Sequence, residues 1–366
     1  MSNPGGDIRS CGHLVRATRL AAVNSTPPTS QYGETSVASS SRALPAAGCA
    51  GGGWQTRRYL ELFRWGCKVE YGAPMPSICV CPICQGRTEH SRSVGDLTVA
   101  SCSHCGHGWL TDLPQKNRHY DTSHYVNWRH ENQAATRRRA KQYLTDFSEL
   151  VTGQPRTAVE IGCSTGETIG LLAERGVQGW GADTSEAAIE QARARFPQVG
   201  FTVGAMPILD APVDAALMMH VIEHVPSPID VLHDVRSLVA DGGAIYLRTP
   251  NYAGAAAQVL RGAWPDFLAE HLHYFTPRSI TTALSASGWQ PESVRTEGGA
   301  WVWLGGVKRI VKQQRPSLSK GTGAPPGRRQ MQVLSLAHRW GRPLWRAEGR
   351  SGRGNELIVT ARRATG

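Results

Sequence analysis

The stretch AVEIGCSTGETIGLLAERGVQGWGAD, residues 158–183, decides the fold of this chain. It opens on an apolar run, 158–161, which predicts a buried strand, and continues into a glycine-containing turn, 162–166. A helical pattern follows and ends at a glycine, and a second apolar run, 177–182, ends on Asp183. This order of strand, turn, helix and strand predicts two parallel strands joined by a right-handed crossover.

The turn and the acid together indicate a nucleoside ligand. Gly162 and Gly166 allow the backbone to approach a ligand closely, and the N-terminus of the following helix favours a negative group. Asp183 follows the first glycine by about 20 residues, and an acid at that distance can accept hydrogen bonds from both ribose hydroxyls. The alternative is a βαβ unit whose glycine turn and acid coincide by chance, and the later motifs favour the ligand.

The rest of the central region continues the alternation of strands and helices. The run from 213 to 219 is almost wholly apolar, which is typical of a strand covered on both faces. We expect a turn at 241–243. Further strands are expected at 199–203, 213–219 and 244–248, and further helices at 132–151, 185–195 and 228–239. The pattern predicts an α/β fold with a parallel sheet.

Two motifs give this region a family resemblance. The pattern E-x-G-x-S-x-G, residues 160–166, resembles motif I of the class I S-adenosylmethionine (SAM) dependent methyltransferases, which usually have glycine where Ser164 stands. A dinucleotide site would show G-x-G-x-x-G, and its absence disfavours an NAD-dependent oxidoreductase. Residues 220–251 and 270–289 are similar to the branch that includes ubiquinone O-methyltransferases and many glycan and natural-product methyltransferases. The resemblance covers 120–289, with a weaker match at GRGNELIVTARR near the C-terminus.

The resemblance implies a Rossmann-like class I methyltransferase sheet that binds SAM. In that family the motif I loop contacts the methionine part of SAM, and Asp183 matches the acid that binds the ribose. Ala205 and Met206 follow the third strand, where the adenine would lie, and His220 is expected at the methionine end. The residues expected to bind SAM are Glu160, Gly162, Cys163, Ser164, Gly166, Asp183, Thr184, Ala205, Met206, Met219 and His220.

Two C-x-x-C pairs precede this region and predict a metal centre. They are Cys81-Pro-Ile-Cys84 and Cys102-Ser-His-Cys105, with 17 residues between Cys84 and Cys102. Four thiolates can complete a tetrahedral Zn²⁺ site, and such a closed site is structural. Free thiols or redox pairs are the alternatives. The zinc ribbon so predicted resembles a domain appended in part of the same branch, including sugar C-methyltransferases.

Methyl transfer requires an acceptor in line with the sulfonium and, where needed, a base for its proton. The candidates for the base are His224, His271 and His273, although each could equally be a core histidine. We favour Glu270 and His271, because the matching pair in the zinc-containing sugar C-methyltransferases is tied to proton abstraction. His224 is the second choice, and Tyr125 could reach the site from a preceding segment.

Charge indicates the kind of partner. The 366 residues include 40 Lys+Arg and 29 Asp+Glu, for a net charge of +11, and the excess is concentrated in 308–363. Such a tail suits a phosphorylated acceptor, nucleic acid or an anionic membrane surface, or it is simply a solvated surface. No apolar run approaches the ~20 residues of a membrane span, and nothing reads as a secretory signal, so we expect a cytoplasmic location.

We expect four segments along the chain. Residues 1–70, rich in Gly, Ser, Ala and Pro, predict a disordered extension, although their arginines also fit a transit peptide. The zinc ribbon is expected at 76–115, the methyltransferase domain at 120–300, and a basic segment ending in a strand at 301–366.

The sequence therefore favours a SAM-dependent methyltransferase that acts on an oxygen or carbon of a small-molecule, sugar or glycan acceptor. One alternative is a zinc-containing RNA methyltransferase, in which Trp301, Trp303, Trp340 and Trp345 would stack on bases. Another is a non-catalytic zinc-ribbon interaction protein, which the intact glycine turn and Asp183 disfavour. The pattern specifies neither the acceptor nor the oligomeric state.

Overall fold

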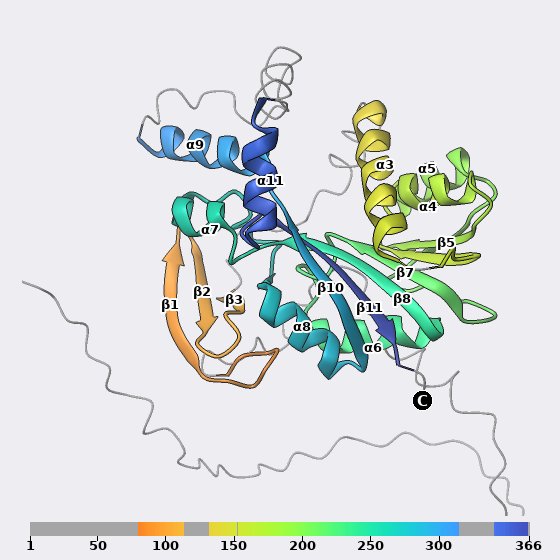
Figure 1. Cartoon of the computed structure of the whole chain (residues 1–366), viewed down its shortest axis with the longest axis horizontal. Helices are drawn as coiled ribbons and strands as arrows, with labels where there is room; N and C mark the ends of the chain where they lie inside the picture. Colours follow the sequence, from red (N-terminus) through yellow and green to blue (C-terminus); the bar gives the residue numbers. More distant parts are fainter. Residues whose placement is uncertain (1–79, 113–131, 152, 315–339, 365–366) are drawn as a thin grey trace, which may run out of the picture. The chain divides into compact units, whose positions relative to one another are not determined.

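A seven-stranded sheet organises the protein, in the order β10-β11-β8-β7-β4-β5-β6 (Figure 1). The computed structural model describes residues 80–112, 132–151, 153–314 and 340–364. The five parallel strands are β4 (Thr157–Ile161), β5 (Gln178–Asp183), β6 (Gly200–Val203), β7 (Val213–Met219) and β8 (Val239–Pro250). These include all the strands expected from the apolar runs, and the predicted α/β Rossmann-like fold is confirmed.

The order of the strands reverses next to β4. From β4 the chain adds β5 and β6 on one side, and it then returns to the other side with β7 and β8. In open α/β sheets this switch point, at the carboxyl ends of the strands, is where ligands bind. The candidate site is therefore expected beyond Ile161, Asp183 and Met219, which end three of these strands.

Helices cover both faces of the sheet, and the strands alternate accordingly. α3 (Gln133–Leu150), α4 (Glu167–Ala173) and α5 (Glu186–Arg195) lie on one face, and α6 (Pro228–Leu238) and α8 (Pro277–Ala286) lie on the other (Figure 1). Ala158 and Leu217 pack in the cluster with the first set of helices, whereas Val159 and Ala216 pack with the second set. Because both faces are covered, neighbouring residues on each strand are apolar.

Two further strands complete the sheet, and the apolar runs did not predict their positions in it. β10 (Trp289–Glu297) and β11 (Glu356–Arg363) are antiparallel to each other, and β11 is inserted between β10 and β8. The strand expected near the C-terminus thus lies inside the sheet. Between these two strands the structure describes α9 (Ala300–Gln314) and α11 (Arg342–Arg350), drawn in blue in Figure 1.

The turn expected at 241–243 falls within the bounds of β8, between Val239, which pairs with Val213, and Ala244, which pairs with Ala215. Gly242 has φ +74°, and the register between β7 and β8 shifts between Val213 and Ala215. A left-handed glycine lets the chain turn at this irregularity, and regular pairing resumes at Ala244, where the apolar run begins.

A second, smaller sheet joins the N-terminal part to the rest of the chain. It contains β1 (Thr88–Val94), β2 (Leu97–Cys102), β3 (Gly108–Asp112) and β9 (His273–Tyr274), in that order. β9 comes from the segment that follows β8, after α7 (Ala255–Leu260) and a 3₁₀ turn (Arg261–Ala263). An apolar cluster that includes Val99, Leu110, Trp264, Phe267 and Tyr274 fixes this segment to the smaller sheet.

Several expectations lie outside the described residues. They are the extension 1–70 and the tyrosine at 125. Among the residues that the structure describes, no helix has both the length and the apolar character to cross a membrane.

Candidate functional site

The turn after β4 has a backbone that only glycine fits at two positions. Gly162 has φ +70° and Gly166 has φ +74°. A Cβ at Gly162 would lie 2.3 Å from Cγ2 of Val221, and one at Gly166 would lie 2.7 Å from Cζ of Phe201. The two glycines thus keep this turn close to its neighbours as well as open toward a ligand.

Asp183 holds this turn against the end of β5. The backbone amide of Ser164 donates to Oδ2 of Asp183 at 2.8 Å, and that of Ser185 donates to Oδ1 at 2.9 Å. Ser164 itself has φ +48°, a conformation that costs a non-glycine residue about 1–2 kcal/mol. The bond to Asp183 offsets that cost. The carboxylate is therefore oriented at the carboxyl edge of the sheet by the protein alone.

The other residues expected to bind SAM surround the same edge. Glu160 is buried, and its Oε2 accepts from the backbone amide of Ile169 at 2.9 Å, which fixes the start of α4. The amide of Gly204 donates to the carbonyl of Asp183 at 2.9 Å, so Ala205 and Met206 follow directly beside β5. Cys163, Thr184, Met219 and His220 complete the set at the ends of their strands.

His220 stands between two carboxylates. Its Nδ1 lies 3.3 Å from Oε1 of Glu223, and its Nε2 lies 2.8 Å from Oε1 of Glu356 at the start of β11. Burial disfavours the charged ring, but the charge of Glu356 and the hydrogen bond to Glu223 outweigh it, and together they raise the pKa of His220 well above its ordinary value. His220 is thus an imidazolium at neutral pH, which makes it a charged neighbour of the site.

Arg248 in β8 anchors the far side of Glu356. Its guanidinium donates to both oxygens of Glu356, at 3.0 and 2.8 Å, to Asp146 of α3 at 2.6 Å, and to Glu297 of β10. Only 1% of the Arg248 side chain is exposed. Sequence reasoning missed this network, although an arginine inside an apolar strand signals buried acidic partners.

A buried cluster of one carboxylate and two imidazoles lies on the other side of His220. Glu223 is 1% exposed and accepts from Oγ1 of Thr249 at 3.0 Å. One donor atom from each of Glu223, His224 and His271 lies within 4.8 Å of the others. The rings of His224 and His271 meet edge to face with centroids 4.7 Å apart. The structure therefore brings together both histidines that the sequence singled out.

The ionisation of this cluster follows from its burial. Burial opposes the charge on Glu223, but the hydrogen bond from His220 and its charge outweigh that effect and lower the pKa of Glu223 to about 2. Burial lowers the pKa of His271 to about 4, so its ring is neutral at pH 7. The cluster is an ionised carboxylate beside a neutral imidazole.

Glu270 differs from its expected role beside His271. Its main-chain carbonyl accepts from Nδ1 of His224 at 2.8 Å. Among the described residues, no hydrogen bond or ion pair joins its carboxylate to His271. The carboxylate that lies within 4.8 Å of a ring nitrogen of His271 is that of Glu223.

His273, the third candidate, faces the smaller sheet. Its Nδ1 lies 3.1 Å from Nε2 of His107, and its Nε2 lies 3.4 Å from the carbonyl of Pro226. Both rings are buried. Since these contacts use both nitrogens of His273, we assign it to packing between β3 and β9.

The four predicted metal ligands form one cluster. The sulfurs of Cys81 and Cys105 lie 3.6 Å apart, and those of Cys84 and Cys102 lie 3.4 Å apart. The backbone amides of Ile83 and His104 point at the sulfurs of Cys81 and Cys102, each at 3.4 Å. A hydrogen bond from the thiol of Cys105 lowers the pKa of Cys81 to about 5. The four sulfurs can hold one metal ion.

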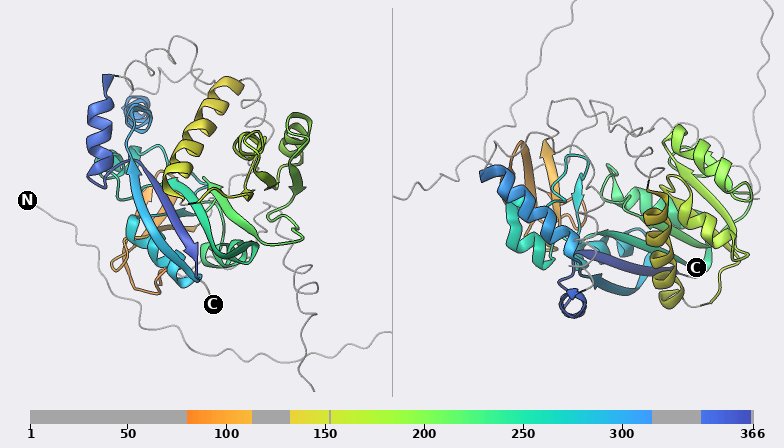
Figure 2. Two further views of the ribbon diagram at one scale, coloured as in Figure 1. Left: turned by 45° about the vertical axis from the view of Figure 1, so that its right-hand side comes forward. Right: turned by 90° about the horizontal axis from the view of Figure 1, so that it is seen from above.

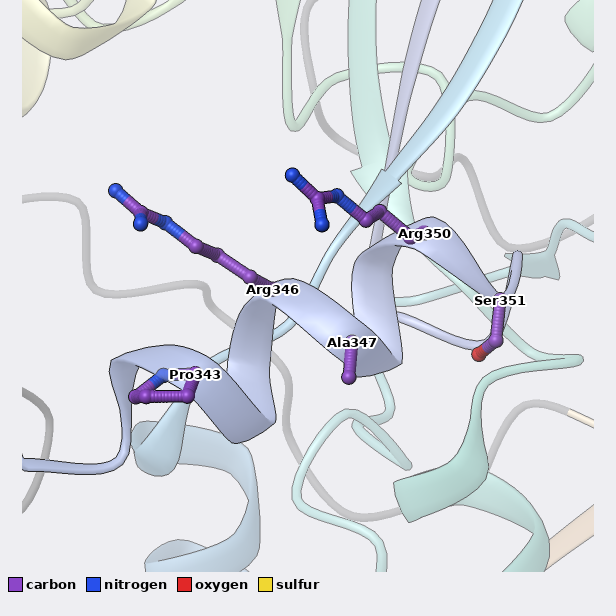
Figure 3. A pocket seen from close by; sticks show the side chains of 5 residues that line it. All are labelled: Pro343, Arg346, Ala347, Arg350 and Ser351. Atoms are coloured by element: carbon purple, nitrogen blue, oxygen red, sulfur yellow. The ribbon is translucent and has the colours of Figure 1, made fainter.

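A surface hollow of about 580 Å³ lies elsewhere, on α11. It is lined by Pro343, Arg346, Ala347, Arg350 and Ser351, and Figure 3 shows the two arginines extending from the helix. No residue from the ends of the parallel strands lines it. We therefore do not assign it to the candidate site.

Comparison with known proteins places the central region. Residues 128–294 match the family model described as a methyltransferase domain. This segment, just under half of the chain, is similar to that family. It contains the glycine turn, Asp183 and the cluster around Glu223.

Individual relatives are more distant. The chain is 33% identical over 149 residues to a ubiquinone biosynthesis O-methyltransferase of Roseobacter denitrificans, covering 36% of this chain and 59% of the relative. It is 28% identical over 130 residues to an uncharacterized 37.1 kDa protein in transposon TN4556 of Streptomyces fradiae. That match covers 33% of this chain and 38% of the relative. The chain thus spans well under two thirds of these two relatives. A solved complex of the Haloferax volcanii Trm112 methyltransferase activator with a methyltransferase aligns with TM-score 0.46 and 14% identity, over 68% of this chain and 100% of that one.

Proposed function

We propose that the protein is a SAM-dependent methyltransferase that transfers a methyl group to an oxygen or carbon of a small-molecule, sugar or glycan acceptor. The observation that carries the proposal is the glycine turn held to Asp183 by the Ser164 amide at 2.8 Å. This arrangement lies at the switch point of the sheet, where nucleoside ligands bind in open α/β folds. It belongs to a segment that matches a methyltransferase-domain family.

The residues at the carboxyl edge of the sheet indicate which part of SAM each would contact. The turn from Gly162 to Gly166 would take the methionine part, and Asp183 would accept from the ribose hydroxyls. Both oxygens of Asp183 are already held by backbone amides, so the carboxylate needs little ordering when the ligand arrives. Ala205 and Met206 would lie beside the adenine, and Met219 and His220 beside the methionine end.

The reaction requires a deprotonated acceptor in line with the sulfonium. A lone pair of the acceptor forms a bond to the methyl carbon while the bond from sulfur to that carbon breaks. The electron pair stays on sulfur and gives S-adenosylhomocysteine. The acceptor proton passes to the imidazole of His271 or to that of His224. Glu223, 1% exposed and ionised, would stabilise the imidazolium so formed.

The cluster of Cys81, Cys84, Cys102 and Cys105 is proposed to bind structural Zn²⁺. With Zn–S distances of about 2.3 Å, sulfurs at the corners of a tetrahedron lie roughly 3.8 Å apart. The separations of 3.6 and 3.4 Å in the structure are close to that value. Four thiolates leave no open position, which supports a structural role rather than a catalytic one.

The test uses purified protein, methyl-labelled SAM, and a panel of acceptors that contains catechols, sugar nucleotides and RNA. We expect label in a small-molecule acceptor, with turnover reduced about 10²–10⁴-fold by His271→Ala and SAM affinity retained. His233→Ala, an exposed histidine of α6, is the matched control and should leave turnover unchanged. Transfer to no member of the panel, together with no SAM binding, would contradict the proposal.

An RNA acceptor is the second candidate. Trp340 is 82% exposed and Trp301 is 48% exposed. Arg346 and Arg350 extend from α11 (Figure 3). Exposed aromatic rings and arginines can bind single-stranded RNA. Trp303 argues the other way, because its Nε1 donates to Glu348 at 3.1 Å as a packed residue does. RNA binding that weakens steeply with salt would favour this candidate.

A further inference from the structure

The carboxylate of Glu223 and the rings of His224 and His271 converge in the core beside the candidate SAM edge. One donor atom from each lies within 4.8 Å of the others. Glu223 is 1% exposed and His271 is 6% exposed. Two imidazoles and one carboxylate are the donor set by which proteins hold divalent first-row metals with coordination positions left open.

Two of the three groups are already oriented by other atoms. Nδ1 of His224 lies 2.8 Å from the carbonyl of Glu270, which fixes that nitrogen as the protonated one and leaves Nε2 with its lone pair. A metal-binding histidine almost always makes such a bond through its second nitrogen. Glu223 is held by Thr249 at 3.0 Å and by His220 at 3.3 Å, as ligating carboxylates usually are.

The third group supplies an independent observation. Nδ1 of His271 is buried and has no hydrogen-bond partner among the described residues. Buried polar atoms nearly always have a partner, and each exception requires an explanation. The ring of His271 packs at 4.7 Å against that of His224, so the unpartnered nitrogen belongs to a ring of the same cluster. A bound cation would satisfy it.

We propose that Glu223, His224 and His271 bind a divalent first-row metal ion that in turn binds an oxygen of the acceptor. This inference rests on the proposed function and narrows the acceptor to a hydroxyl compound, favouring one with two neighbouring oxygens that can chelate the ion. The site is distinct from the four-cysteine cluster, because its donors are nitrogen and oxygen and it leaves positions open.

The ion would replace a strong base in the reaction. A bound cation lowers the pKa of a coordinated O–H group, so the acceptor hydroxyl releases its proton to water and remains on the ion as an oxyanion. The oxyanion then attacks the methyl carbon, and the bond to sulfur breaks with its electrons on sulfur. Metal–nitrogen distances of about 2.1 Å place donor atoms roughly 3.4 Å apart, so small rotations of the side chains would close the site.

The test titrates Co²⁺ into the full chain after its four cysteines have been loaded with Zn²⁺. Co²⁺ bound by nitrogen and oxygen gives weak visible absorption, whereas Co²⁺ bound by thiolates adds an intense charge-transfer band. We expect one Co²⁺ per chain with no thiolate band. Glu223→Gln and His271→Gln should each weaken Co²⁺ binding by at least about 10-fold, in line with losses on altering metal sites. His233→Gln, on an exposed part of α6, is the control and should change nothing.

The outcomes separate this inference from the proposed function. No Co²⁺ binding by the folded wild-type chain, or only the thiolate band, would overturn the metal site. The same holds for one bound Co²⁺ that neither variant weakens. Calorimetric titration with SAM, done on the same samples without Co²⁺, reports on the SAM site alone. SAM binding without Co²⁺ binding would leave a methyltransferase whose histidines act as bases.

Discussion

Nε2 of His107 lies 3.1 Å from Nδ1 of His273, and this contact joins the four-cysteine module to the segment that carries His271. Around it, Trp109 pairs with His273 across β3 and β9, and the amide of Leu110 donates to the carbonyl of Leu272 at 3.0 Å. Oγ1 of Thr276 donates to the carbonyl of Cys105 at 2.8 Å. The predicted metal module is therefore part of the scaffold of the candidate acceptor site.

Removing the metal should loosen that segment. Chelation of the proposed Zn²⁺ removes the ion that holds β2 and β3 together, so we expect a lower unfolding temperature. Amide hydrogen exchange should accelerate in peptides covering 270–276, while peptides covering β4 keep their protection. Equal protection of 270–276 with and without the ion would show that the cysteine cluster does not support the segment.

Single substitutions at Gly162 and Ser164 should change the free energy of unfolding by different amounts. Gly162→Ala places a Cβ 2.3 Å from Val221 at φ +70°, and we expect a loss of about 1–3 kcal/mol in the free energy of unfolding. Ser164→Gly removes the strain of a left-handed non-glycine residue, but it also increases the conformational entropy of the unfolded chain. These effects oppose each other, so the free energy of unfolding should change by no more than about 1 kcal/mol. Chemical denaturation measures both. A Gly162→Ala protein as stable as wild type would argue against the close approach of Val221.

Replacing Arg248 should lower the stability of the fold strongly. Arg248→Met leaves Glu356, Asp146 and Glu297 facing one another without their cation, and we expect a loss of about 3–5 kcal/mol. Glu174→Gln is the control, because Glu174 pairs with Arg137 on the surface and should matter by about 1 kcal/mol or less. Urea unfolding of the two variants should give clearly different midpoints.

Asp266 should make stability depend on pH. Burial raises its pKa to about 7, although the charge of His220 acts in the opposite direction. A raised pKa means that this carboxyl stabilises the fold fully below its unfolded pKa, about 4, and that the contribution is lost as pH rises through 7. Such a change corresponds to at most about 4 kcal/mol.

Asp266→Asn should therefore flatten the change in unfolding free energy between about pH 4 and pH 7. Asp210→Asn, at an exposed position after β6, is the matched control and should keep the wild-type profile. If both variants followed the wild-type curve, the carboxyl of Asp266 would not titrate in this range.

The sequence predicted the parts of the site that depend on neighbouring residues. The apolar runs located the parallel strands, and the spacing of Gly162, Gly166 and Asp183 located the turn and its acid. Both signals are local, because a strand covered on two faces must be apolar and a left-handed turn selects glycine. The C-x-x-C spacing likewise predicted that four sulfurs would meet.

The remaining features depend on long-range contacts. Glu356 reaches His220 only because β11 inserts beside β8, and no local pattern indicates that insertion. Glu270 was paired with His271 through the family resemblance, and the fold also brings Glu223 from another segment to within 4.8 Å of His271. Glu223, shortly after the apolar strand β7, and Glu356, at the start of the apolar strand β11, were the available signals.

The affinity for SAM tests the central claim most directly. Isothermal titration of the full chain with SAM should give a single site, and Asp183→Asn should weaken it about 10–100-fold, as the loss of hydrogen bonds to a charged group implies. Thermal unfolding of the variant must first establish that it folds, because Asp183 also accepts from Ser164 and Ser185. Unchanged SAM affinity in a folded Asp183→Asn protein, or no SAM binding by the wild type, would contradict the account.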